Sequence, residues 1–283
     1  MYKTIIDCER LAENLDNPDW VIVDCRYDLM DSAAGQRHWL ESHIPGAVYA
    51  SVGKELSGNV DGLAITDKGR HPMPAPETMT ETFSRLGIDS SKQVVVYDHS
   101  GGAFCARLWW MLRYMQHEAV AVLDGGWSSW TQQDRSLESG VGSNERTQFS
   151  GEPIRERLIV LDQVSEVEFL IDSRDPDRYQ GKLEPIDRAA GHIPGAKNHF
   201  WQNNLNEQGQ FHSSEKLKES FKNLLDNTQA DEAVFYCGSG VTACHNILAI
   251  VHAGLGEPGL FGGSWSEWSS DPARPVETGT GSL

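Results

Sequence analysis

The sequence lacks the features that mark several common classes of protein. None of its apolar runs is long enough to span a bilayer as a helix. Positive charge is scarce, with 24 Lys and Arg residues against 41 Asp and Glu residues and a formal net charge of -17. Nucleic acids and anionic membrane surfaces are bound through clustered cations, so this composition argues against both as partners. An anionic substrate therefore has to be attracted by local arginines.

Cysteine is scarce too, and its spacing excludes some uses. The five cysteines form no CxxC pair and have no spacing typical of metal ligands; they are Cys8, Cys25, Cys105, Cys237 and Cys244. A structural zinc site or a disulfide framework is therefore not expected. Segment 1–10 carries acidic residues where a signal peptide has its apolar core, so we expect a cytoplasmic protein with reduced thiols.

The most informative stretch surrounds Cys237. An apolar run of strand character over 233–236 leads to this cysteine, and 241–251 has apolar residues at helical spacing. The pattern predicts a strand, a tight loop and a helix, with the thiol at the carboxyl end of the strand, where open α/β sheets bind ligands. Gly238 and Gly240 allow backbone N–H groups to point at the sulfur, and the helix dipole adds positive charge. We therefore expect Cys237 to be a nucleophilic thiolate.

Two other interpretations of Cys237 are weaker. A buried cysteine at the end of a core strand is commonly inert, but packing alone does not require two glycines directly after the strand. A cysteine phosphatase needs an arginine six positions after its nucleophile to bind phosphate oxygens, and this chain has Ala243 there. The small, uncharged loop fits a compact sulfur-bearing substrate better, with a sulfur atom transferred through a persulfide.

The chain contains an internal repeat. Four landmarks recur in the same order, and the pairs are Val21–Arg26 with Phe169–Arg174, His43–Ala47 with His192–Ala196, Val94–Asp98 with Ala233–Cys237, and Gly125–Trp130 with Gly263–Trp268. Each copy alternates apolar β-branched runs with helical stretches such as 103–115 and 214–225, which predicts an α/β domain with a mainly parallel sheet. The polar, Gly- and Ser-rich stretch 131–157 is the predicted linker, so we place the domains at 1–145 and 146–283.

The repeat separates residues of the fold from candidate functional residues. Asp98 stands at the position of Cys237, so the first copy has no sulfur nucleophile and we expect its domain to be inactive. His43 and His192 occur in both copies, and we interpret them as hydrogen-bond formers that fix loops. Arg174 also has a counterpart in the first copy, which predicts an ion pair that holds the fold together.

Cys-Gly-Ser-Gly-Val-Thr, over 237–242, resembles the active-site loop of the 3-mercaptopyruvate sulfurtransferases within the rhodanese superfamily. The resemblance covers nearly the whole chain through the repeated landmarks. It implies a five-stranded sheet flanked by helices in each copy, and a catalytic second domain beside an inactive first one. Thiosulfate-specific members usually carry basic residues in this loop, and this loop has none, so the resemblance favours mercaptopyruvate as the sulfur donor.

The resemblance also implies arginines that bind the substrate. Arg178 aligns with the first of two such arginines. The second normally follows a Glu-Pro pair directly, and this chain has Ile186 there, so Arg188, two places on, is the candidate. The alternative for both arginines is a solvated or ion-paired surface charge.

A proton relay is implied as well. Ser239 is expected to donate a hydrogen bond to the sulfur or keto oxygen of the substrate as charge develops. In the family this serine contacts a histidine, here His71, and an aspartate, whose place this chain fills with Ser51 or Ala50.

The remaining expectations concern the loop and the helix after it. Thr242 is expected to cap that helix, and Cys244 to be buried within it. Backbone N–H groups of the loop are expected to bind the sulfur anion and the substrate, and they belong to Gly238, Gly240, Val241 and Thr242.

Together these observations predict a sulfurtransferase. Cys237 would take a sulfane sulfur from 3-mercaptopyruvate and pass it from a persulfide to cyanide, a small thiol or a protein dithiol such as a thioredoxin-like protein. No metal or organic cofactor is implied. Two alternatives stay open: thiosulfate as the donor with the same persulfide mechanism, and a non-catalytic persulfide carrier that binds a partner protein.

Overall fold

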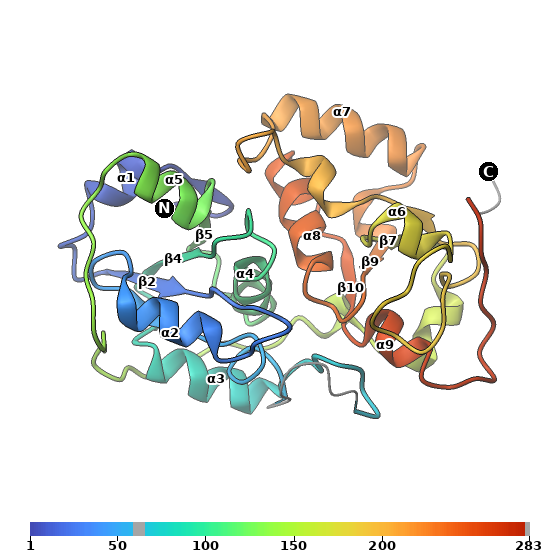
Figure 1. Ribbon diagram of the computed structural model, residues 1–283, viewed down its shortest axis with the longest axis horizontal. Helices are drawn as coiled ribbons and strands as arrows, with labels where there is room; N and C mark the ends of the chain where they lie inside the picture. Colours follow the sequence, from blue (N-terminus) through green and yellow to red (C-terminus); the bar gives the residue numbers. More distant parts are fainter. Residues whose placement is uncertain (59–65, 281–283) are drawn as a thin grey trace. The chain divides into compact units, whose positions relative to one another are not determined.

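The computed structural model describes residues 1–58 and 66–280 (Figure 1). The chain divides into two compact units. Unit 1 comprises Met1–Gly62, Pro74–Ile154 and Glu207–Phe211, and unit 2 comprises Leu63–Met73, Arg155–Asn206 and His212–Leu283, of which 59–65 and 281–283 lie outside the described part. Within the described residues, no helix is both long and apolar enough to cross a membrane.

The division differs from the domain boundary expected at residue 145. Unit 1 continues to Ile154, and the described segment 66–73 packs with unit 2 although it comes from the first half of the sequence. Its polar and Gly/Pro-rich sequence carries no periodic signal, so only tertiary contacts reveal where it packs.

Unit 1 contains a parallel five-stranded sheet. Its strands lie in the order β1 (Ile5–Ile6), β5 (Val120–Leu123), β4 (Gln93–Tyr97), β2 (Trp20–Asp24) and β3 (Val48–Tyr49). The central strands are Val-rich and buried on both faces, as expected when helices cover a parallel sheet. In Figure 1, α1 (Cys8–Ala12) and α5 (Gly126–Gln132) cover one face, and α2 (Ala34–Glu41) and α3 (Pro76–Arg85) cover the other.

Unit 2 repeats this sheet. The order is β6 (Leu158–Ile159), β10 (Gly259–Phe261), β9 (Ala233–Tyr236), β7 (Phe169–Asp172) and β8 (Lys197–Asn198), again parallel throughout. Each strand takes the place of its counterpart in unit 1, so the predicted repeat of one α/β domain with a five-stranded sheet is confirmed.

Helices flank the second sheet as well (Figure 1). The described helices of unit 2 are α6 (Pro176–Tyr179), α7 (Ser214–Leu225), α8 (Ala243–His252) and α9 (Ser264–Trp268), with 3-10 turns η1 (Arg155–Arg157), η2 (Leu161–Glu166), η3 (Trp201–Asn204) and η4 (Ala230–Glu232). In unit 1 the counterpart of α8 is α4 (Cys105–Tyr114). The helices predicted at 103–115 and 214–225 are therefore confirmed, with slightly shorter bounds for the first.

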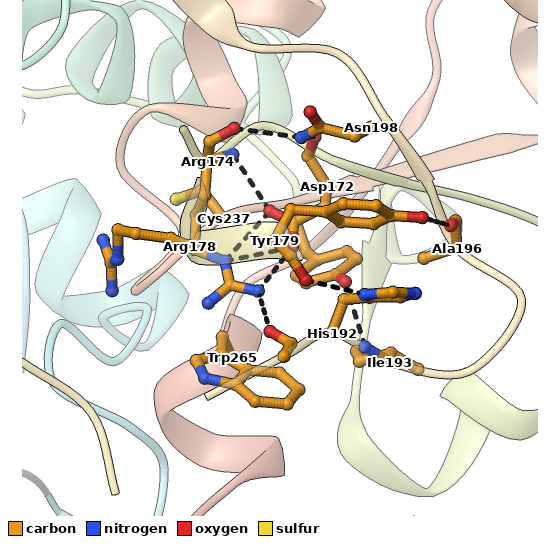
Figure 2. A network of polar contacts seen from close by, with 12 residues as sticks. Asp172, Arg174, Arg178, Tyr179, His192, Ile193, Ala196, Asn198, Cys237 and Trp265 are labelled. Carbon is orange, nitrogen blue, oxygen red and sulfur yellow. Dashed lines mark hydrogen bonds and ion pairs between the residues drawn. The ribbon is translucent and has the colours of Figure 1, made fainter. Parts of the chain in front are cut away.

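The arginine and histidines shared by both copies hold the fold together, as predicted. Arg174 forms a buried ion pair with Asp172 at 2.6 Å, and its guanidinium lies 4.7 Å from the centre of the Trp265 ring. Figure 2 shows this arginine between the carboxylate and the indole. His192 Nδ1 lies 2.7 Å from the Tyr179 carbonyl, and His43 makes the equivalent contact in unit 1.

Candidate active site

The site is built at the carboxyl end of β9. The strand ends at Tyr236, and Cys237 follows with 2% of its surface exposed. Its N–H donates to Ser264 Oγ at 3.1 Å, and its carbonyl accepts from the Trp265 N–H at 3.0 Å. The start of α9, which follows the neighbouring strand β10, therefore fixes the backbone of Cys237.

The loop between Cys237 and α8 makes the tight turn that the glycines predict. Gly240 has a φ of 73°, in the left-handed region that glycine adopts without strain. The first hydrogen bonds at the start of α8 run from Cys244 N–H to the Val241 carbonyl and from His245 N–H to the Thr242 carbonyl. The N–H groups before them lie at a helix N-terminus, where anions bind.

Two expectations about α8 have different outcomes. Cys244 is fully buried, and its thiol donates to the Gly240 carbonyl at 3.3 Å, so its predicted burial is confirmed. Thr242 occupies the N-cap position, but it has helical backbone angles and its side chain makes no capping hydrogen bond, so that prediction is wrong. A capping side chain needs an extended backbone at its own residue, and the loop geometry does not provide it.

Ser239 and His71 meet within unit 2. His71 Nδ1 lies 2.8 Å from Ser239 Oγ, with 3% and 8% of the two residues exposed. The segment that carries His71 is held on α9, because the Arg70 N–H donates to Ser266 Oγ at 3.1 Å. A buried hydroxyl and imidazole at this distance can exchange a proton with a group bound at the loop.

Arg178 lies beside the loop. It projects from α6, whose start is capped by the Asp175 carboxylate. A Cβ atom added at Gly238 would be 3.6 Å from Arg178 Nη1, so the guanidinium is adjacent to the residue after the nucleophile. Figure 2 shows Arg178 and the Cys237 sulfur on the same side of the polar network, away from His192.

Arg188 has a different environment. It is exposed, and the hydrogen bond described for it runs from Nη1 to the Ser270 carbonyl at 3.4 Å. The second guanidinium beside the loop belongs to Arg70, whose Nη2 would be 3.2 Å from a Cβ at Gly238. We did not anticipate Arg70 from the sequence, and its only signal there is its place next to His71.

Two carboxylates organise the arginines. Glu184 contacts Arg174 at 3.2 Å and Arg178 at 2.8 Å, while Asp187 contacts Arg178 at 3.0 Å and Arg70 at 2.7 Å. Burial by itself would raise the pKa of Glu184, but hydrogen bonds from Arg178 and from backbone N–H groups outweigh it, so the pKa lies below its usual range. Glu184 therefore stays ionised and holds both of its arginines in place.

The equivalent loop of unit 1 is closed around its own carboxylate. The Asp98 side chain is fully buried. It accepts four backbone hydrogen bonds of 2.7–3.0 Å, donated by the N–H groups of Ser100, Gly102, Phe104 and Cys105. The carboxylate occupies the centre of the turn that a bound anion would otherwise occupy.

Known proteins share this architecture over most of the chain. The model of the rhodanese-like domain matches residues 7–133 and 158–271. A protein of Pseudomonas aeruginosa, named as a probable 3-mercaptopyruvate sulfurtransferase, is 41% identical over 281 residues, which cover 97% of this chain and 98% of that protein. The 3-mercaptopyruvate sulfurtransferase of Escherichia coli K12 is 30% identical over 96% of this chain and 97% of its own length.

Solved structures agree with the sequence comparison. The 3-mercaptopyruvate sulfurtransferase from Leishmania major has a TM-score of 0.84 at 30% identity, over 95% of this chain and 74% of that one. The structure of SseA from Escherichia coli, described as a 3-mercaptopyruvate sulfotransferase with the rhodanese fold, has a TM-score of 0.79 at 29% identity, over 94% of this chain and 100% of that one. With two matched domains and full-length relatives at this identity, the chain belongs to the rhodanese family.

Proposed function

We propose that the protein is a sulfurtransferase that moves a sulfane sulfur from 3-mercaptopyruvate to a thiophilic acceptor through a persulfide on Cys237. The observation that carries this proposal is the surroundings of one buried thiol. Cys237 sits at the end of β9 and the start of the α8 loop, with the Arg178 guanidinium beside Gly238 and the Ser239–His71 pair in the same loop.

In the first half-reaction, the Cys237 thiolate attacks the sulfur of mercaptopyruvate. The carbon–sulfur bond breaks, its electron pair goes to the carbon, and the enolate of pyruvate leaves while Cys237 keeps the outer sulfur as a persulfide. The enolate then takes a proton to become pyruvate. Ser239 and His71, 2.8 Å apart, are the groups placed to deliver that proton.

Charge stabilisation comes from two sources. The backbone N–H groups of 238–242 precede α8, and we expect them to stabilise the negative charge on sulfur. Arg178 binds the carboxylate of the substrate, since a planar guanidinium matches a carboxylate in a two-point contact. Its orientation is set by Glu184 and Asp187.

In the second half-reaction, the acceptor attacks the outer sulfur and restores the Cys237 thiolate. Cyanide leaves as thiocyanate. A protein dithiol, such as that of a thioredoxin-like protein, becomes a disulfide and releases hydrogen sulfide. Because donor and acceptor react in separate steps, the kinetics should be ping-pong.

Thiosulfate is the second candidate donor. SseB of Mycobacterium tuberculosis H37Rv, named as a candidate thiosulfate sulfurtransferase, is 37% identical over 288 residues, which cover 98% of both chains. Thiosulfate carries two negative charges, and the loop after Cys237 has no basic residue to bind the second one. This favours mercaptopyruvate as the donor. A third possibility, a persulfide carrier without turnover, would use the same cysteine.

A paired steady-state assay separates these functions. Wild type and Cys237→Ser are compared with mercaptopyruvate or thiosulfate as donor and cyanide or dithiothreitol as acceptor. We expect a higher kcat/KM with mercaptopyruvate and no turnover in the variant. A higher kcat/KM with thiosulfate would overturn the choice of donor. Persulfidation of Cys237 without turnover on either donor would favour the carrier.

We also propose a reducing, cytoplasmic location. All five cysteines are free and buried, and the mechanism requires Cys237 to be reduced at the start of each cycle. Fractionation of the native host with an antibody against the protein would test this location.

A further inference from the structure

One buried hydroxyl next to β9 has no partner. Ser173 directly follows β7, it is fully buried, and its Oγ makes no hydrogen bond within the part of the chain that the structure describes. The backbone of this residue is paired, because its N–H donates to the Tyr236 carbonyl at 2.8 Å and its carbonyl accepts from the Trp201 N–H at 3.2 Å. Buried polar side chains normally have a partner, so this hydroxyl requires an explanation.

Strand register places the Ser173 side chain on the same side of the sheet as the Cys237 thiol. β7 and β9 are parallel neighbours in which Asp172 pairs with Tyr236, so the next residues of the two strands are Ser173 and Cys237. The preceding pair lies together on one face, since burial raises the pKa of the Tyr236 hydroxyl well above its usual range and the nearby Asp172 carboxylate raises it further. Successive side chains of a strand point to opposite faces. Ser173 and Cys237 therefore share the other face.

Unit 1 has the same arrangement around a side chain that is already an anion. Its two equivalent positions hold Cys25 and Asp98. The preceding pair again lies on one face, because the Tyr97 hydroxyl donates to the Asp24 carboxylate at 2.7 Å. Burial raises the pKa of the Cys25 thiol well above its usual range, and the carboxylates of Asp24 and Asp98 raise it further. A side chain at this position therefore lies close to an anion held in the turn.

The Asp98 side chain indicates where the outer sulfur of a persulfide would lie. A carboxylate oxygen and the outer sulfur of a cysteine persulfide are each two bonds beyond Cβ. Because the Asp98 carboxylate accepts four backbone hydrogen bonds inside its turn, we expect the outer sulfur at the corresponding place in unit 2. We propose that Ser173 is a further catalytic residue, whose hydroxyl donates a hydrogen bond to the anionic outer sulfur of the Cys237 persulfide. This inference rests on the proposed function for that intermediate.

This hydroxyl distinguishes the persulfide from the free thiolate. In the resting protein Ser173 Oγ has no bond to any described residue, the Cys237 sulfur included. It gains an acceptor when a second sulfur extends the side chain. A hydrogen bond that forms only then stabilises the intermediate and the transition state that leads to it more than the free enzyme, so it accelerates the first half-reaction.

The test measures the persulfide without a keto-acid donor. Inorganic polysulfide loads Cys237, because the thiolate attacks a terminal sulfur, the adjacent sulfur–sulfur bond breaks, and the shorter polysulfide dianion leaves with the electron pair of that bond. Iodoacetamide then alkylates the persulfide anion and not its protonated form, so the pH midpoint of the alkylation rate reports how well the site stabilises the anion. Wild type is compared with Ser173→Ala. The matched control is Ser57→Ala, which removes a buried hydroxyl of unit 1 that also lacks a partner among the described residues.

We expect Ser173→Ala to raise the pH midpoint of the persulfide by about 1, a roughly tenfold change in its ionisation, because a hydrogen bond to a charged sulfur is lost. The midpoint for the free Cys237 thiol should move by less than about 0.3, and the control variant should move neither midpoint by more than that. Arg70, Arg178 and His71 also lie at the loop, and they are unchanged in all three proteins, so they do not contribute to the differences.

The stability of the variant separates a catalytic hydroxyl from a structural one. Ser173→Ala should unfold at the same urea concentration as wild type or at a higher one, because an unpaired buried hydroxyl costs free energy in the resting protein. Equal shifts in the two midpoints, no shift in either, or failure of polysulfide to load Cys237 would overturn the inference. Absence of turnover with mercaptopyruvate, while the persulfide made with polysulfide shows the expected shift, would contradict the proposed function alone.

Discussion

The loops after β4 and β9 share two backbone features and differ in the side chain at their first position. Each begins directly after its central strand and has a left-handed glycine at the fourth position, Gly101 with φ 66° and Gly240 with φ 73°. The first residue of each accepts a backbone hydrogen bond from a tryptophan N–H, at 2.8 Å for Asp98 and 3.0 Å for Cys237. The fold thus provides an anion-binding turn twice, and a single residue decides whether it is filled from within.

The residues around the two loops differ as well, in that an arginine lies beside the loop of unit 2. Features common to both units are the ones that hold the fold, such as the buried Asp24–Arg26 and Asp172–Arg174 pairs. Four residues after Arg26 the chain has the exposed Met30, whereas four residues after Arg174 it has Arg178 beside the loop. The position that supplies Arg178 beside the thiol loop therefore has an uncharged residue in unit 1.

Of the changes considered, removal of the Cys237 thiol should cause the largest loss of activity. Cys237→Ser should lower kcat with mercaptopyruvate by at least about 1000-fold, because a serine hydroxyl does not form a persulfide. Cys105→Ser, which changes a buried cysteine after the unit 1 loop, is the matched control and should keep most of the activity. Steady-state thiocyanate formation measures both variants. Equal losses in the two would show that the loops are not functionally distinct.

Removal of the carboxylate should damage unit 1 in a different way. Asp98→Ala leaves four buried or partly buried N–H groups without their acceptor and should cost about 3–5 kcal/mol of unfolding free energy. Cys237→Ala should cost much less, since no comparable set of bonds to its side chain is broken. Urea unfolding of both variants gives the comparison. A small effect for Asp98→Ala would mean that the carboxylate does not hold its loop closed.

Loss of Arg178 should selectively weaken the binding of donors that carry a carboxylate. Arg178→Gln should lower kcat/KM with mercaptopyruvate by about 10- to 100-fold through the lost contact with the carboxylate. Mercaptoacetone, which has a methyl group in place of the carboxylate of mercaptopyruvate, is the control donor, and its rate should change little. A matching decrease with mercaptoacetone would assign Arg178 to loop structure instead.

Glu184 should give a smaller, pH-dependent effect. Its pKa in the folded protein lies below its ordinary value of 4.5, so its contribution to stability is complete above about pH 4.5 and is lost as pH falls through the folded pKa. Glu184→Gln should cost about 1–2 kcal/mol at pH 7, and the difference from wild type should narrow below about pH 4. Thermal unfolding from pH 7 to pH 3 measures this. A constant difference in stability across that range would contradict the lowered pKa of Glu184.

The sequence predicts the fold better than it predicts the site. The repeat, the parallel sheets, the position of Cys237 and the structural roles of Arg174 and His192 follow from local patterns that occur twice. Arg70 could not be predicted, because its segment has no periodicity and its place beside Gly238 depends on tertiary contacts with unit 2. The Thr242 cap failed because loop geometry overrides local propensity.

The most direct test of the account is the mass of the intact protein after exposure to mercaptopyruvate without an acceptor. We predict one added sulfur atom per chain, located by peptide mapping on Cys237, removed by cyanide and absent from Cys237→Ser. An added sulfur on Cys105 or Cys244, or an unmodified chain after pyruvate has been released, would contradict a persulfide at the end of β9.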